Sequence, residues 1–174
     1  WQEPEAKNSA TAYDFPALKR GEVVKEQLEH RIPQDTTGFV YNTKKPVFTD
    51  PRVRHALAYM LDFEWMNKAL FYGQYRRTQS YFTNTEYAVS GLPDADELAI
   101  LEPLRQLVPP QVFSEPFSLP VTEGDGNLRA NMRAAIRLLD EAGWELKNQR
   151  MINRQSGVPL EFELLSYRPL TEKS

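Results

Sequence analysis

The residues that could do chemistry are few, and none has the spacing of a catalytic or metal-binding motif. The two histidines, His30 and His55, stand far apart without ligand-like neighbours. The sequence has no Gly-x-Ser-x-Gly elbow, no His-Glu-x-x-His pair and no phosphate-binding loop. It also has no cysteine, which excludes disulfides, thiolate catalysis and cysteine-based zinc sites. We therefore predict no catalytic residue, no cofactor and no bound metal.

The loop Glu123–Asn127, EGDGN, is similar to two ligand-binding patterns and fits neither. A calcium loop that began at Glu123 would need a glycine and a glutamate where Leu128 and Ala134 stand. A dinucleotide fingerprint would need a third glycine after a hydrophobic strand. We predict instead that Asn127 caps the helix that follows.

Aromatic and arginine side chains interleave between residues 59 and 87. Flat amphipathic rings and guanidinium donors that line a cleft can hold a peptide backbone or a carboxylate. Rings at this density more often pack in a core while the arginines face solvent, so both interpretations stay open. On the first interpretation the candidate ligand-binding residues here are Tyr72, Tyr75, Arg76, Arg77 and Tyr81.

Basic charge is too sparse to indicate a nucleic-acid partner. The formal net charge is −3, so the chain lacks a polybasic surface for phosphate backbones or anionic lipid. Arg129, Arg133 and Arg137 recur at intervals of four along a helical pattern, and such a stripe is more often a solvated face than an anion site. We predict no nucleic-acid binding.

The stretch 38–73 contains the elements around which the chain is organised. It predicts a strand over residues 39–42, then a turn, then a helix that begins at Asp50-Pro51. There the carboxylate accepts free amides and the proline forfeits no hydrogen bond. Asp62 is expected to cap a second helix, and Gly73 is expected to end it in a left-handed conformation.

Proline, glycine and acidic residues predict where the remaining helices and strands begin and end. A helix should begin near Asp94, with carboxylates in its first turn, and should break at or before Pro103 because proline does not continue a helix. The prolines between residues 93 and 120 predict an extended excursion. The later elements are expected to be a helix over 128–142 ended by Gly143, strands at 144–146, 150–152 and 160–165, and a turn at 153–157.

The run Tyr41–Leu57, YNTKKPVFTDPRVRHAL, resembles the N-x-x-x-P-x-F-x-D-x-R-V-R-x-A-L segment of family 5 extracellular solute-binding proteins, which serve ABC importers. Residues 138–144 and 156–160, LLDEAGW and SGVPL, resemble the helix-then-hairpin element of the same family. The pieces that resemble the oligopeptide-binding branch associated with microcin C uptake are residues 13–17, 63–65, 71–75, 80–82 and 90–93.

The resemblance implies an α/β, periplasmic-binding-protein-like (type II) fold, of which this chain would be a partial second lobe with a mixed sheet and flanking helices. It implies a periplasmic protein that closes two lobes around an oligopeptide ligand and hands it to ABC permease and ATPase subunits. Tyr41, Asn42 and Lys45 match the motif near the cleft, so they are expected to bind the peptide. Asp50 and Arg54 also match, and we assign them to the fold.

The chain of 174 residues is much shorter than members of that family and opens at Trp1. We expect an excised piece of a larger protein, with the signal peptide and the missing lobe of the same chain outside it. The single fragment divides into an entry segment 1–37, a strand plus two helices 38–92, a helix and proline-rich excursion 93–126, and a helix plus hairpin 127–174.

Two other classes of function compete with transport. A stand-alone protein-interaction module could bind a partner through the aromatic cluster and the proline-rich loop. A hydrolase with a pair of carboxylates is the less favoured class, because no spacing singles out such a pair. A natural module should have complete sheet edges, whereas a piece of a lobe should leave strands unpaired.

Overall fold

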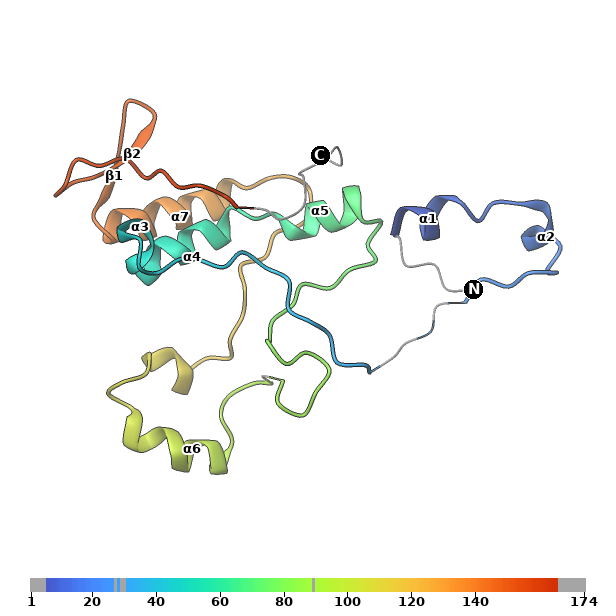
Figure 1. Ribbon diagram of the computed structural model, residues 1–174, viewed down its shortest axis with the longest axis horizontal. Helices are drawn as coiled ribbons and strands as arrows, with labels where there is room; N and C mark the ends of the chain where they lie inside the picture. The colour runs from blue at the N-terminus through green and yellow to red at the C-terminus, as the bar shows by residue number, and fades with distance from the viewer. Residues whose placement is uncertain (1–5, 27, 29–30, 89, 166–174) are drawn as a thin grey trace. The chain divides into compact units, whose positions relative to one another are not determined.

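The computed structural model describes residues 6–26, 28, 31–88 and 90–165 (Figure 1). The chain divides into two compact units. Unit 1 comprises Trp1–Phe39 and Asp62–Asn127, and unit 2 comprises Val40–Leu61 and Leu128–Ser174. Among the helices of the described residues, none is long and apolar enough to cross a membrane.

Unit 2 begins with two successive helices, α3 (Pro46–Thr49) and α4 (Pro51–Tyr59). The predicted start of α4 is confirmed, because the Asp50 carboxylate accepts the Arg52 amide at 2.8 Å and Pro51 occupies the first helical position. The turn predicted after residue 42 forms at Thr43 and Lys44, and the short helix α3 that follows it was not predicted. Lys45, which has extended backbone angles, precedes a proline that is preorganised for a helical turn.

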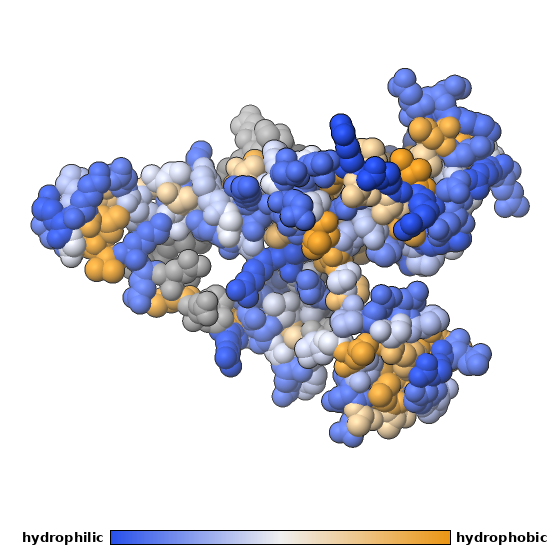
Figure 2. Space-filling model, turned by 180° about the vertical axis from the view of Figure 1, so that it is seen from behind, coloured by the Kyte–Doolittle hydropathy of each residue, from blue (hydrophilic) through white to orange (hydrophobic). Residues whose placement is uncertain are grey.

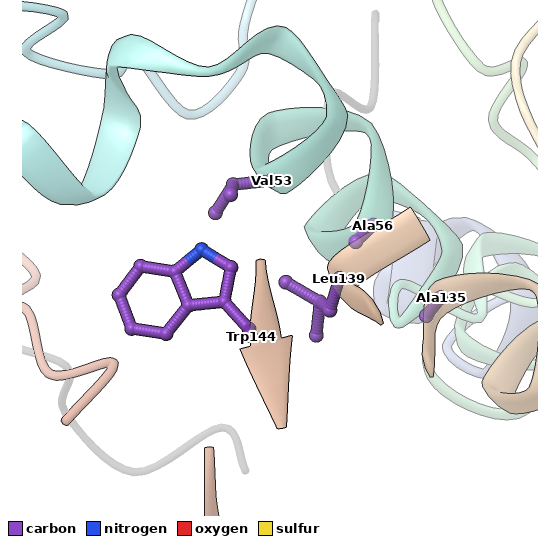
Figure 3. Close-up of a cluster of buried hydrophobic side chains, with 5 residues drawn as sticks. All are labelled: Val53, Ala56, Ala135, Leu139 and Trp144. Atoms are coloured by element: carbon purple, nitrogen blue, oxygen red, sulfur yellow. The ribbon is translucent and has the colours of Figure 1, made fainter. Parts of the chain in front are cut away.

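The core of unit 2 forms where α4 packs against α7 (Arg129–Glu141) and the strand that follows (Figures 1 and 3). Val53 on α4 is only 1% exposed. Small side chains on both helices let their backbones approach closely, and the Trp144 ring fills the remaining space. The cluster consists of Val53, Ala56, Ala135, Leu139 and Trp144. Val53 and Ala56 therefore make one face of α4 a core face.

A hairpin follows α7, formed by β1 (Trp144–Lys147) and β2 (Arg150–Asn153) in antiparallel register, with Trp144 opposite Asn153. Its two-residue loop is Asn148-Gln149, and both residues have positive φ (49° and 65°), as a primed hairpin turn requires. The sequence predicted the two strands correctly but missed this turn.

The segment that was expected to make the hairpin turn, 153–157, instead forms an Asx turn after β2. The Asn153 side-chain oxygen accepts the amides of Gln155 and Ser156 at 3.1 and 2.9 Å. Gly157 completes the reversal with φ +70°. A single antiparallel bridge between Ile152 and Pro159 follows.

The strands predicted at 39–42 and 160–165 do not form. A strand needs a hydrogen-bonded neighbour along its length. In the second segment the Leu160 amide donates to the Met151 carbonyl at 2.8 Å, whereas the Glu161 amide donates to the nearby Pro159 carbonyl at 3.0 Å and makes no cross-strand bond. The sheet of the described chain is accordingly the two-stranded hairpin alone, rather than the mixed sheet that we expected.

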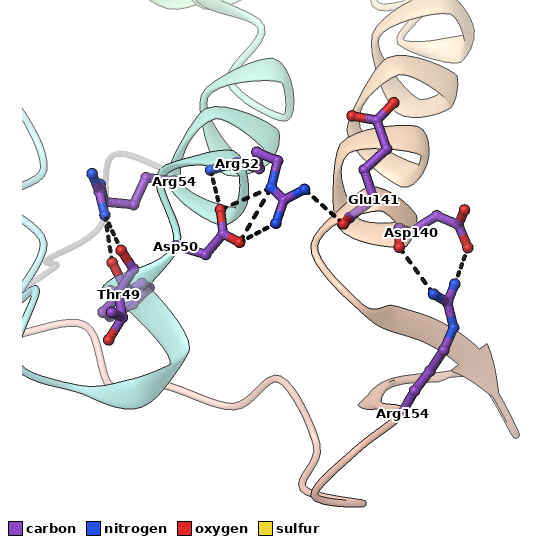
Figure 4. Close-up of polar contacts among 8 residues, drawn as sticks. Thr49, Asp50, Arg52, Arg54, Asp140, Glu141 and Arg154 are labelled. Carbon is purple, nitrogen blue, oxygen red and sulfur yellow. Dashed lines mark hydrogen bonds and ion pairs between the residues drawn. The ribbon is translucent and has the colours of Figure 1, made fainter. Parts of the chain in front are cut away.

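Two arginines bind the last carbonyls of α7 (Figure 4). Arg52 Nη1 donates to the Glu141 carbonyl at 2.7 Å, and Arg154 Nη1 donates to the Asp140 carbonyl at 3.0 Å. Cations at a helix C-terminus satisfy free carbonyls and favour the helix dipole. Gly143, with φ +87°, ends the helix as predicted.

The prediction that Asn127 caps α7 is wrong. The position before the helix is Leu128, which makes no side-chain cap. The Asn127 amide instead donates to the Asp125 carboxylate at 2.8 Å. This Asx turn competes with helix capping, because it holds Asn127 in the turn that precedes the helix and not at the capping position.

Unit 1 contains the short helices α1 (Ala6–Thr11) and α2 (Pro16–Lys19), then α5 (Phe63–Leu70) and α6 (Ala95–Leu101), then the 3-10 helices η1 (Glu102–Leu104) and η2 (Pro110–Phe113). Asp62 caps α5 by accepting the Trp65 amide at 3.0 Å, as predicted. Gly73 follows the helix with φ +72°.

The start of α6 is also confirmed. Asp94 accepts the amides of Asp96 and Glu97, while the Glu97 side chain accepts the Asp94 amide at 2.9 Å, which completes a capping box. The α-helix ends at Leu101, before Pro103, as predicted. Figure 2 shows apolar side chains at the surface of this part of the chain, where Ile100 and Leu107 are 70% and 81% exposed.

Candidate functional site

The first group of candidate residues lies at the start of α3 in unit 2. The Tyr41 ring packs on Phe48, with centroids 5.1 Å apart, and Phe48 packs on Phe162 at 5.3 Å. Phe48 is only 7% exposed, so it fixes the two outer rings. Two segments far apart in sequence, around Tyr41 and around Phe162, therefore meet on one buried ring.

Asn42 and Lys45 belong to the turn between Tyr41 and α3. The Asn42 side-chain oxygen accepts the Lys44 amide at 3.1 Å, and its carbonyl accepts the Lys45 amide at 3.0 Å. The Lys45 carbonyl in turn accepts the Phe48 amide at 2.9 Å. Both side chains are exposed, so the turn that follows Tyr41 presents an amide and an ammonium group to solvent.

Arg54 is more closely connected to this group than the sequence indicated. Its Nη1 donates to the carbonyls of Phe48 and Thr49 at 2.6 and 3.1 Å (Figure 4). Burial raises the pKa of the Tyr41 hydroxyl above its ordinary value, and the Arg54 charge opposes that shift in part. Arg54 therefore serves the fold, as expected, and also contributes positive potential at Tyr41.

The second group of candidate residues follows α5 in unit 1, and Asn67 determines its conformation. The Asn67 side chain donates to the Tyr75 carbonyl at 2.7 Å and accepts the Tyr75 amide at 3.0 Å. Its own carbonyl accepts the Gly73 amide at 2.8 Å. Sequence reasoning missed Asn67, because an asparagine in the last turn of a helix shows no sign of a contact eight residues away.

This clamp presents the candidate tyrosines to solvent. Tyr72 has φ +55° and is 45% exposed, and Tyr75 is 47% exposed and lies edge-on to Phe71 at 5.0 Å. Arg76 is exposed as well. Tyr81, further along, is 82% exposed. The rings in this group are thus surface groups held by an ordered backbone rather than core residues.

Arg77 differs from the other candidates because it is half-buried. It donates to the Pro120 carbonyl, and its guanidinium lies 6.0 Å from the centroid of the Phe63 ring. Burial lowers the pKa of Arg77 from its ordinary value, and the Glu64 charge raises it by a smaller amount. Through these contacts the Arg77 side chain connects three segments of unit 1. Its role in ligand binding stays a prediction.

Asp62 and Glu64 are two carboxylates that share a hydrogen-bond partner, and they do not resemble a catalytic pair. Asp62 is 8% exposed, and Thr122 Oγ1 lies 2.5 Å from its Oδ1 and 3.3 Å from Glu64 Oε2. The Thr122 amide also donates to Glu64 at 3.1 Å. The pair therefore holds the loop that precedes α7. No cluster of metal-ligating side chains occurs in the described ranges.

The contact between this loop and α5 explains why the EGDGN loop has glycine at position 124. Gly124 has φ +68°, and a Cβ atom there would lie 3.3 Å from the Glu64 backbone. Only glycine fits without displacing the chain. The loop therefore packs on the first turn of α5 and is neither a calcium loop nor a nucleotide fingerprint.

Comparison with known proteins now identifies the family. Residues 1–173 match the family described as bacterial extracellular solute-binding proteins, family 5 Middle. Uncharacterized protein YejA of Escherichia coli (strain K12) is 47% identical over 94% of this chain and 27% of its own length. Probable peptide-binding protein YejA of Agrobacterium fabrum is 42% identical over 94% of this chain and 27% of its own length. Peptidoglycan-binding protein YepA of the same organism is 37% identical over 93% of this chain and 26% of its own length.

The chain thus spans about a quarter of the length of the curated relatives it matches. The motif around Asp50 and the helix-then-hairpin element lie within the matched residues, and both form in the structure. The chain belongs to the bacterial extracellular solute-binding proteins of family 5.

Proposed function

We propose that this chain is part of the substrate-binding subunit of an ABC importer and that the intact protein captures oligopeptides in the periplasm. The observation that carries the proposal is the family match over residues 1–173, together with a 42% identical relative whose name states peptide binding. The intact protein would deliver its ligand to permease and ATPase subunits. The binding step is non-covalent and needs no catalytic residue.

Family membership implies a periplasmic-binding-protein-like fold. We assign the described residues to part of the second lobe, in which the segments 39–42 and 160–165 become strands of a larger mixed sheet. Neither segment forms a strand among the described residues, and the rings of Tyr41 and Phe162 pack on Phe48. A strand forms only when a neighbouring strand pairs with it, and the rest of the intact protein would supply that neighbour.

The turn that carries Tyr41, Asn42 and Lys45 is the favoured peptide contact in unit 2. The exposed Asn42 amide can pair with ligand backbone, and the exposed Lys45 ammonium can neutralise a ligand carboxylate. In unit 1, Tyr72, Tyr75, Arg76 and Tyr81 offer rings and a guanidinium on a surface that Asn67 keeps ordered. Contacts to backbone and termini would leave side-chain sequence loosely specified.

The test is calorimetric titration of the intact protein that contains this chain with a mixture of tri- to hexapeptides. Micromolar binding to the intact protein supports the proposal, and its absence contradicts it. The isolated chain should bind peptides negligibly, because one wall of the cleft would be missing. Uptake of labelled peptides by cells with and without the gene tests the transport step, and their sensitivity to microcin C tests the narrower subtype.

A second ligand class, peptidoglycan fragments, is suggested by the name of the 37% identical relative. Muropeptides combine a peptide stem with sugars, so the same titration with a muropeptide separates the two classes. Tighter binding of the muropeptide than of its free stem peptide would replace oligopeptides with peptidoglycan fragments as the ligand. A stand-alone interaction module would bind neither.

A further inference from the structure

The helices α6, η1 and η2 of unit 1 are stabilised by contacts within one stretch of the chain. The Leu107 amide donates to the Leu104 carbonyl at 2.7 Å, so the helical course that begins with α6 continues past η1. Arg105 donates to the Glu102 carboxylate at 2.8 and 2.6 Å and lies 3.9 Å from the centroid of the Phe113 ring, which joins η1 to η2. The main packing partner of α6 among the described helices and strands is η1, which follows it directly.

Three aliphatic side chains of this stretch face solvent. Ile100, Leu104 and Leu107 are 70%, 42% and 81% exposed. Residues spaced four and three positions apart along a helical course lie on one side of it, so these side chains form one apolar surface. We refer to this surface as the α6 face.

The α6 face is not needed for the packing of its own stretch. Leu98, Leu101 and Phe113 are half-buried, so they are the apolar side chains that α6 and η2 partly bury between them. None of the described residues from 90 to 120 is fully buried. Single exposed apolar side chains are common at protein surfaces, but adjacent ones form a patch that marks an interface. A group that covers the α6 face must therefore come from outside this stretch.

The composition of the α6 face indicates what kind of interface it forms. Transient interfaces depend on tryptophan, tyrosine and arginine, whereas leucine is under-represented among the residues that carry their binding energy. The interior of a folded protein is rich in leucine and isoleucine instead. The α6 face consists of one isoleucine and two leucines, so it resembles a surface that is permanently buried.

A permanent cover is most easily supplied by the same polypeptide. A covalently joined segment is present at a high effective concentration and does not pay the entropy of association that a separate partner pays. The chain spans about a quarter of the length of its curated relatives. In a protein of that length, most of the polypeptide would lie outside this chain and could provide the covering surface.

We propose that the α6 face packs against the part of the intact protein that lies outside residues 1–174. The occupant of this surface is therefore neither a ligand nor a separate protein, and α6, η1 and η2 connect unit 1 to the remainder of its own polypeptide. The inference goes beyond the proposed function, because it holds whichever ligand the intact protein captures. Failure of peptide binding would leave it unaffected.

The test is cysteine labelling of the intact protein. The 174 residues contain no cysteine, so Ile100→Cys, Leu107→Cys and the control Gln106→Cys are each made in an intact protein freed of any other cysteine. Gln106 is exposed and next to Leu107, on another side of the helical course. Both face positions should react with a maleimide at least about tenfold more slowly than the control, because labelling requires local opening. Reaction at both positions as fast as at the control overturns the proposal.

A second pair of variants tests the same contact without a small side chain that could loosen it. Leu107→Glu and Gln106→Glu introduce the same charge at neighbouring positions in the intact protein. A carboxylate buried against an apolar surface is costly, so Leu107→Glu should lower the melting temperature by about 3 °C or more, and Gln106→Glu by no more than about 1 °C. Equal melting temperatures of the two variants overturn the proposal.

Two other occupants are distinguished by the same labelling rates. If the face positions become slow to react only as the protein concentration is raised, a second copy of the protein covers the α6 face. If they react rapidly in the purified protein and slowly after vesicles that contain the ABC permease are added, the permease covers it. Either result overturns the proposal and assigns the α6 face to the other partner.

Discussion

Each unit is stabilised internally by a different kind of interaction. Each buried apolar side chain among the described residues belongs to unit 2, from Phe48 to Trp144. The buried residues that the structure describes in unit 1 are Asp62 and Gly124, a carboxylate and a glycine. An apolar core tolerates many sequences of the right pattern, whereas a buried polar contact depends on particular partners. The stability of unit 2 should therefore depend on the burial of its apolar side chains, and the stability of unit 1 on particular polar contacts.

The difference also bears on ligand binding. The large apolar side chains that unit 2 exposes are mainly aliphatic, such as Val40 and Leu165 at 97% and 98% exposed. Unit 1 keeps its rings at the surface, with Tyr81 and Tyr87 at 82% and 70% exposed, and fixes them through backbone hydrogen bonds. Binding residues are often found on such loops, which a scaffold positions without burying.

The largest expected effect is on the core of unit 2. Trp144→Ala removes a ring that is 6% exposed and contacts both helices of the cluster. We expect the free energy of unfolding to fall by about 3–5 kcal/mol, the usual range for truncating a buried aromatic residue. Chemical denaturation followed by circular dichroism measures the change, and hydrogen exchange shows where protection is lost.

The control for this prediction is on the same strand. Leu146→Ala removes a side chain that is 64% exposed, so its cost should stay below about 1 kcal/mol. If amides of α5 and α6 lose as much protection as those of α4 and α7 in Trp144→Ala, the contrast between the two units is wrong.

A glycine provides the next test, now in unit 1. Gly124→Ala and Gly21→Ala both put a side chain at positive φ, +68° and +76°, but only at Gly124 would the new Cβ meet backbone, 3.3 Å away at Glu64. The conformational strain, about 1–2 kcal/mol, is common to both variants. Gly124→Ala should therefore be the more destabilising, by about 1 kcal/mol or more in thermal unfolding. Equal melting temperatures of the two variants would show that the loop at Gly124 moves away from Glu64 without a loss of stability.

Thr122→Val should have a smaller effect on the same loop. The substitution keeps the shape of the side chain and removes the hydroxyl that lies 2.5 Å from Asp62 and 3.3 Å from Glu64. Leaving a buried carboxylate with one partner fewer costs about 1–2 kcal/mol. Thr85→Val, which removes an exposed hydroxyl bonded to the Phe82 carbonyl, is the matched control. A Thr122→Val protein as stable as the control would mean that the buried carboxylates do not depend on this hydroxyl.

Helix starts could be predicted from sequence because capping is local. Asp50-Pro51, Asp62 and the Asp94–Glu97 box each place donor and acceptor within three residues, and all three formed as predicted. The prediction that Asn127 caps α7 was wrong because the Asn127 amide donates to Asp125, a competing local hydrogen bond that the sequence pattern did not reveal. The turn at Asn148-Gln149 was missed because the more conspicuous Asn153–Gly157 sequence also favours a turn.

Strands and site contacts could not be predicted in the same way. Residues 39–42 and 160–165 have strand-like composition, but a strand also requires a partner, which composition does not specify. The clamp by Asn67 and the burial of Arg77 depend on residues 8 and 43 positions away. Tyr41, Asn42 and Lys45 were nominated from the family motif, and what the structure adds is the shared support of Phe48.

The smallest expected effect concerns the charge of Asp50, which can be separated from its role as a cap. The bond to the Arg52 side chain lowers the pKa of Asp50 below its ordinary value. Because the folded pKa is the lower one, the stabilisation is fully present above the unfolded pKa, about 3.9, and disappears as the pH falls through the folded value. Asp50→Asn still accepts the Arg52 amide, so it should lose only the ion pair, about 0.5–1 kcal/mol at pH 7. The stability difference between Asp50→Asn and the parent, measured by urea denaturation, should shrink as the pH falls from 5 towards 2. Glu102→Gln removes a similar pair with Arg105 in unit 1, and it should leave the unfolding of unit 2 unchanged at every pH. A constant difference for Asp50→Asn across that pH range would assign the effect to packing instead of charge.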